Sequence, residues 1–60
     1  MVHKIKELCK KKNITLADLE RQAGVSPKSV FSWDRSEPSV YKVYRVAKIL
    51  GTTVENLLEG

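Results

Sequence analysis

The 60-residue sequence has a single cysteine and a single histidine. One cysteine excludes an internal disulfide, and together with one histidine it is too small a ligand set for a structural zinc site. We therefore expect no metal and no cofactor. A chain of this length buries only about 60% of the surface that its unfolded form exposes, so helix packing around one small core must hold it together.

Long apolar runs are also lacking. No stretch approaches the roughly 18 residues of a membrane span, and the amino terminus lacks the apolar block of a secretory signal. We expect a cytoplasmic protein with no membrane partner, and the unpaired Cys9 agrees with a reducing compartment. Cys9 lies on an apolar stripe and His3 in a terminal turn, so no activated nucleophile is formed. With no carboxylate pair either, we expect neither enzymatic activity nor a small-molecule substrate.

The charge balance favours an anionic partner. Lysine and arginine number 11 against 7 acidic residues, a net charge of +4, which suits nucleic acid. The excess lies in residues 1–12, where the first helix is expected. Two interpretations stay open for Lys10, Lys11 and Lys12: they complement the negative end of that helix, or they contact phosphates directly.

Apolar residues recur at intervals of three and four, which predicts α-helices. The first covers residues 2–12 and ends at Asn13, a residue that tolerates the left-handed conformation. The second begins at Thr15, where the hydroxyl can accept a free backbone N–H and Asp18 follows in the first turn. It ends at Gly24, which adopts a left-handed conformation without steric cost.

Three further helices are expected. Ser26 and Pro27 predict the start of the third, as an N-cap and a first-turn proline. Ser39 and Thr53 are expected to cap a fourth and a fifth, with Gly51 between them. The buried faces are expected to include Leu19, Ala23, Val30, Trp33, Val40, Val43, Tyr44, Val46, Ala47 and Leu50. The fold class is thus all-α, with five helices in one domain.

The second and third predicted helices, joined at Gly24, form a helix-turn-helix. In this motif the later helix enters the DNA major groove and the preceding helix crosses the backbone. Lys28, Ser29 and Ser32 place basic and short polar side chains near the start of the later helix, where they reach base edges. Phe31 can lie against thymine methyl groups.

A set of residues with regular gaps supports a family resemblance. It consists of Leu19, Ala23, Gly24, Val25, Val30, Trp33, Pro38 and Ser39, followed by AKILGTTVENLL. From Ile5 to Leu58 the chain resembles the Xre, or lambda-repressor-like, family, to which phage repressors and Cro proteins belong. The short connection from Trp33 to Pro38 is similar to the branch common in phages and mobile elements of Gram-positive bacteria.

The resemblance implies a single five-helix DNA-binding domain over residues 1–60, with the helix-turn-helix at helices two and three. It implies a transcriptional regulator, a repressor that binds double-stranded DNA at a palindromic operator as a homodimer. The implied base contacts are Pro27, Lys28, Ser29, Phe31 and Ser32. The implied DNA backbone contacts are Thr15, Leu16, Ser26, Arg35 and Ser36, and the expected dimer interface is Val54, Leu57 and Leu58.

Some residues depart from the family pattern. Leu16 stands where phage repressors often have a phosphate-binding glutamine, and Pro27 where they often have a base-reading one. Cys9 occupies a site where many members have an arginine paired to the acidic residue matched here by Asp34. These departures weaken the usual phosphate clamp, for which Lys28, Arg35 and the lysines of the first helix can compensate.

Glu20 replaces a small residue that usually packs against the third helix. We expect its side chain to bend outward and to pair with a lysine or with Arg21.

Two other hypotheses remain. An all-helical domain with merely solvated polar faces would leave the exposed Phe31 and the family-like spacing as accidents. An antitoxin-type or adaptor-type module for protein interaction would use the apolar end of the chain, Val54, Leu57 and Leu58.

Overall fold

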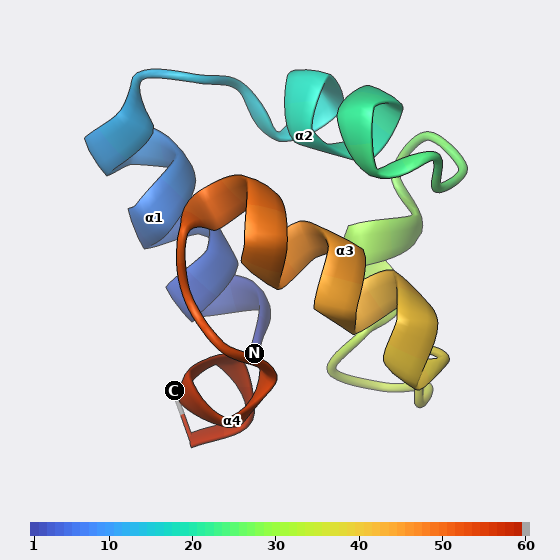
Figure 1. Cartoon of the computed structure of the whole chain (residues 1–60). Coiled ribbons are helices and arrows are strands. Elements are labelled where there is room, and N and C mark those ends of the chain that lie inside the picture. The colour runs from blue at the N-terminus through green and yellow to red at the C-terminus, as the bar shows by residue number, and fades with distance from the viewer. Residues whose placement is uncertain (60) are drawn as a thin grey trace.

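A computed structural model describes residues 1–59. Its secondary-structure elements within this range are all helices, with no strand. The α-helices are α1 (Val2–Lys12), α2 (Leu16–Ala23), α3 (Val40–Leu50) and α4 (Val54–Glu59), and a 3-10 helix, η1 (Ser29–Ser32), lies between α2 and α3 (Figure 1). The all-α prediction is confirmed. The count of five α-helices is not, because the third predicted helix is a 3-10 helix of 4 residues.

Three of the four predicted N-caps are confirmed. The side-chain oxygens of Thr15, Ser39 and Thr53 each accept a backbone N–H from three residues further on, at 3.0, 3.3 and 3.0 Å. Each bond satisfies one of the free N–H groups that every helix has at its start. These three residues therefore fix where α2, α3 and α4 begin.

The predicted helix ends are also confirmed. Asn13, Gly24 and Gly51 follow α1, α2 and α3 with φ of 61°, 72° and 70°. At Gly24 the backbone N–H donates to the carbonyl of Arg21, and the next N–H, of Val25, donates to the carbonyl of Glu20. The chain reverses at this point, which brings the following segment back against α2.

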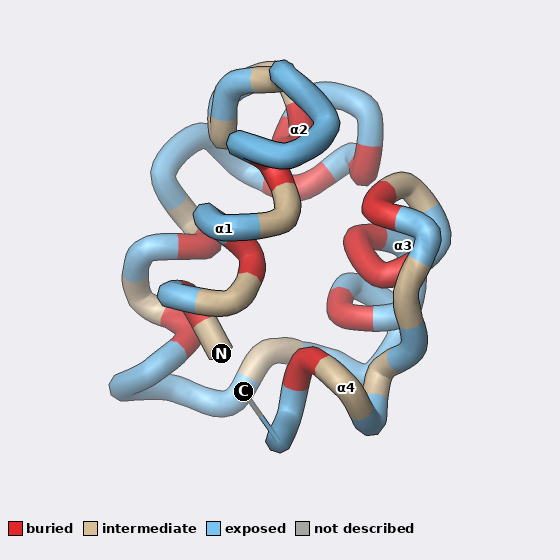
Figure 2. The backbone as a smooth tube through the Cα atoms, turned by 90° about the vertical axis from the view of Figure 1, so that its left-hand side faces the viewer, coloured by how far each residue is buried: buried red, intermediate tan, exposed pale blue. Residues whose placement is uncertain are grey.

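The core surrounds α3, which packs against α1, α2 and α4 (Figure 1). The buried parts of these helices face one another across the centre of the molecule (Figure 2). The side chains with almost no solvent exposure come from four helices and η1: Ile5, Leu19, Val30, Val46 and Leu57. Cys9 is also in the core, as predicted, and burial raises the pKa of its thiol.

Two residues predicted on the buried face of α3 lie outside the core. Val40 is 73% exposed and Tyr44 is 50% exposed. The buried stripe is Val43, Val46, Ala47 and Leu50, and a single helix face of this width is all that so small a core can cover. The Tyr44 ring instead lies beside the Lys48 Nζ, 5.6 Å from the ring centroid.

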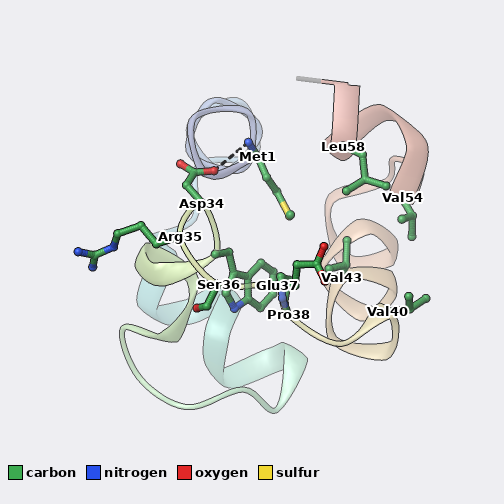
Figure 3. Close-up of a pocket in the computed structure, with 11 residues that line it drawn as sticks. Met1, Asp34, Arg35, Ser36, Glu37, Pro38, Val40, Val43, Val54 and Leu58 are labelled. Carbon is green, nitrogen blue, oxygen red and sulfur yellow. Dashed lines mark hydrogen bonds and ion pairs between the residues drawn. The ribbon is translucent and has the colours of Figure 1, made fainter.

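Asp34 connects the end of the segment after η1 to the start of α1. One of its carboxylate oxygens accepts from the Met1 ammonium at 3.1 Å (Figure 3). The same oxygen accepts from the Val2 N–H at 3.3 Å. A carboxylate is favourable at a helix amino end, because the free N–H groups there carry partial positive charge. Asp34 therefore finds partners in α1 although Cys9 replaces the arginine expected at that site.

The two aspartates predict an acid-sensitive fold. A hydrogen bond from the Thr15 hydroxyl is the main cause that lowers the pKa of Asp18, and a hydrogen bond from the Met1 ammonium is the main cause for Asp34. A lowered folded-state pKa gives stability that is present above the unfolded pKa, about 3.9, and is lost as pH falls through the folded value. We expect the melting temperature, measured by circular dichroism, to decrease as the pH is lowered below about 4.

Amide substitutions provide the control for this pH dependence. Asp18→Asn and Asp34→Asn should melt below the wild type at neutral pH and converge with it in acid, where the wild-type carboxyls are protonated. If the melting temperatures of the variant and the wild type still differed as much at the lowest pH, the carboxylates would not be the cause of the acid sensitivity.

Candidate nucleic-acid interface

The segment after Gly24 begins with a β-turn rather than a helix. The Ser29 N–H donates to the Ser26 carbonyl at 3.1 Å, Pro27 is the second residue, and Lys28, the third, has φ 66° and ψ 4°. This bond, the proline and the positive φ are typical of a type II turn. The predicted helix start at Ser26 and Pro27 is therefore wrong, because the fixed φ of proline suits the second residue of a turn as well as a first helical turn.

A single tight turn, η1, follows. The Trp33 N–H donates to the Val30 carbonyl at 3.0 Å, and both side chains are buried, with exposed fractions of 6% and 0%. They are the two inward anchors that the sequence predicts. Between them Phe31 remains 49% exposed, so the segment fixes itself in the core and shows an aromatic ring to solvent. We call residues 26–32 the reading segment.

Glu20 is buried and bound to the reading segment. Its side chain is only 4% exposed; Oε1 accepts the Lys28 backbone N–H at 2.9 Å and Oε2 accepts the Val30 N–H at 3.2 Å. The prediction of an outward Glu20 paired with a lysine or Arg21 is wrong, since Arg21 pairs with Asp18. Sequence reasoning could have found this position, because Glu20 lies three residues before Ala23 on the buried face of α2.

The predicted base-contact residues divide into two groups. Pro27, Lys28 and Phe31 are exposed. Ser29 and Ser32 are half-buried. The Ser29 Oγ is buried with no hydrogen-bond partner within residues 1–59, and the Ser32 Oγ donates to the Ser29 carbonyl at 2.8 Å. A short hydroxyl side chain readily bonds to the backbone of the preceding turn. The surface of the reading segment is thus formed by the first group.

The predicted DNA backbone contacts lie mainly on the surface. Thr15, Ser26, Arg35 and Ser36 are exposed, and the Arg35 side chain extends away from the body of the molecule (Figure 3). Leu16 differs, since it is partly buried against the core. It offers no polar group, in agreement with the departure from the usual glutamine.

A lysine of α1 lies beside the reading segment. The Lys6 Nζ is 5.0 Å from the centroid of the Phe31 ring, a distance at which an ammonium is attracted to the ring face. The lysine-rich first helix therefore adds its positive charge next to Phe31. Spacing along the sequence gave no sign of this pair, because the two residues come from helices that meet only in the folded chain.

An apolar groove of about 320 Å³ lies beside Asp34 and Arg35. The loop through Pro38 and the end of α4 border it (Figure 3). Of the residues predicted for a dimer interface, Val54 and Leu58 line this groove, and Leu58 is 62% exposed. Leu57 is fully buried in the core of its own chain, so it does not contribute to this surface.

No helix among residues 1–59 is long and apolar enough to cross a membrane. In the same residues no group of three or more histidine, cysteine, aspartate or glutamate side chains is placed to hold a metal ion.

Comparison with known proteins agrees with the arrangement of α2, the turn at Gly24 and the reading segment. A family model described as helix-turn-helix matches residues 5–57, from the first turns of α1 into α4. No curated protein and no solved structure matches the chain. The match therefore covers α2, the turn at Gly24 and the whole reading segment.

Proposed function

This chain belongs to the Xre, or lambda-repressor-like, helix-turn-helix family, and we propose that this DNA-binding regulator is a repressor that binds a palindromic operator as a homodimer. The observation that carries the proposal is the surface of the reading segment. It shows Pro27, Lys28 and Phe31 to solvent, while Val30 and Trp33 fix the backbone beneath them. Repression would follow from occupation of promoter DNA.

The reading segment would enter the major groove, which is about 12 Å wide. Lys28 can donate to guanine, and Phe31 can lie against a thymine methyl group. Positive charge on both sides would hold the protein on the phosphates: Lys6 beside Phe31, and Arg35 beyond η1. The first turn of α2 would face the backbone with its free N–H groups.

A dimer would give the spacing that a palindrome requires. The longest dimension of one chain is 26 Å, less than the roughly 34 Å between equivalent half-sites one helical turn apart. One copy therefore reads one half-site. The groove lined by Val54 and Leu58 is the apolar surface that would join two copies, since exposed apolar residues gather there.

Replacing Lys28 tests the proposed reading surface. A duplex that the protein selects from a random pool is compared with a scrambled duplex of the same composition. Lys28→Ala should lower the preference for the selected duplex by about 5-fold to 150-fold per half-site, the value of one good base contact. Ser32→Ala should flatten the preference less than Lys28→Ala, because the Ser32 hydroxyl donates to the Ser29 carbonyl.

Arg35→Ala is the matched control, because it also removes one positive charge. It should weaken binding to both duplexes alike, since a phosphate contact carries no sequence information. If Lys28→Ala leaves the preference unchanged, the reading segment is not where the bases are read.

A further inference from the structure

A buried carboxylate of α2 is bonded to the reading segment, and DNA contact does not explain it. Glu20 accepts two backbone N–H groups of this segment, from Lys28 and Val30, and its side chain is almost inaccessible to water. Among residues 1–59 it forms no ion pair. A carboxylate out of water is costly unless hydrogen bonds compensate, and N–H bonds to a charged acceptor are the stronger kind. Both compensating bonds end on the reading segment.

The same segment holds a lysine in an unfavourable conformation. Lys28 has φ 66°, where side chains other than that of glycine meet the backbone. Such a residue persists only where its surroundings determine it. Here two bonds enclose it, the Lys28 N–H to Glu20 and the Ser29 N–H to the Ser26 carbonyl.

Fixing the Lys28 amide also fixes the direction of the Lys28 side chain. The N–H direction and φ together determine where the Cα–Cβ bond points, because bond lengths and angles are nearly constant. The N–H points inward to Glu20, while the side chain is exposed. The buried carboxylate is thus connected, through one residue of backbone, to a cation on the surface.

We propose that Glu20 is a positioning residue for DNA reading: its carboxylate holds Lys28 in the left-handed conformation and so aims the lysine side chain at the bases. The inference rests on the proposed function, because it assumes that the reading segment faces DNA. It assigns a role to a residue that does not touch the nucleic acid.

Glu20→Gln provides the first test. The amide keeps the size of the side chain but retains one acceptor oxygen, so at least one of the two N–H bonds is lost. We expect the affinity ratio between the selected and the scrambled duplex to fall about tenfold. Hydrogen exchange at the Lys28 and Val30 amides should accelerate more than at other amides.

Ile5→Val is the control for a merely structural role. Ile5 is fully buried in α1, and the substitution removes one methylene from the core without removing a hydrogen bond of the reading segment. Measured at a temperature where every variant is folded, it should leave the affinity ratio unchanged. If the affinity ratio depends on general stability, both substitutions change it. If it depends on positioning of Lys28, only Glu20→Gln changes it.

Lys28→Gly shows whether Glu20 acts through Lys28. Glycine adopts this conformation without steric cost, so the melting temperature should rise by about 5 °C while the affinity ratio falls. In the Lys28→Gly background, Glu20→Gln should no longer change the ratio, because no side chain remains to be aimed. This dependence is measured as a double-mutant cycle.

The outcomes separate the inference from the proposed function. If the wild type selects no duplex from the random pool, the proposed function is overturned and the inference with it. A selected duplex whose preference survives Glu20→Gln would overturn the inference alone. The inference would also be overturned if Glu20→Gln lowered the affinity ratio equally in the wild type and in the Lys28→Gly background.

Discussion

Raising the KCl concentration from about 50 to about 200 mM is expected to lower the affinity for the selected duplex by about a thousandfold. Each phosphate that a lysine or arginine neutralises releases condensed counterions, so binding weakens as salt rises. A dimer that neutralises about six phosphates reaches this magnitude. Fluorescence anisotropy of a labelled duplex over a series of KCl concentrations gives the slope of log affinity against log salt.

Variants that each lack one positive charge show which residues contribute to that slope. Arg35→Ala should reduce the slope by about one unit per copy, because one phosphate contact is lost. Lys48→Ala removes the same charge beside Tyr44 on α3 and should leave the slope unchanged. A wild-type slope near zero would contradict DNA binding through this surface.

Leu57→Ala is expected to remove a large part of the free energy of unfolding. Its side chain has an exposed fraction of 0%, and truncating such a leucine costs about 2 to 5 kcal/mol. The whole fold of 60 residues has a free energy of unfolding of roughly 3 to 9 kcal/mol. The substitution therefore removes a large part of the total, as urea denaturation followed by circular dichroism would measure.

The neighbouring leucine provides a matched control. Leu58 is 62% exposed, so Leu58→Ala should change the free energy of unfolding by less than about 0.5 kcal/mol. If Leu57→Ala were equally mild, α4 would not be part of the core.

Leu58 also tests the proposed dimer. Leu58→Glu should reduce the mass in sedimentation to that of one chain and weaken binding to a two-half-site duplex by about a hundredfold. Unchanged mass and affinity would exclude the groove as the dimer surface. A second protein that remains bound there after nuclease treatment would instead favour the adaptor hypothesis.

The features predicted correctly from the sequence are those decided by neighbours in the chain. Thr15 caps α2 with a bond to a residue three positions on, and Asn13 and Gly24 end helices through their own backbone conformation. These interactions depend on local spacing and residue type alone. These particular boundaries could therefore be predicted without knowledge of the tertiary structure.

The features missed depend on contacts between segments. Pro27 is compatible both with a helix start and with a β-turn, and the carboxylate of Glu20 eight residues before Lys28 favours the turn. The place of Glu20 on the buried face of α2 follows from its spacing to Ala23. Its two hydrogen-bond partners do not, because those free N–H groups face it only after the chain has reversed at Gly24. Tyr44 lies outside the core because the other helices cover only one stripe of α3.

The bonds that hold the reading segment end on its main chain. Glu20 binds the N–H groups of Lys28 and Val30, and the carbonyl of Ser29 accepts the Ser32 hydroxyl. An exchange of side chain at Lys28 or Phe31 therefore removes none of these bonds. In evolutionary terms, the support is separate from the displayed residues, so under the proposed function a lineage could change its operator one substitution at a time while inheriting the same scaffold.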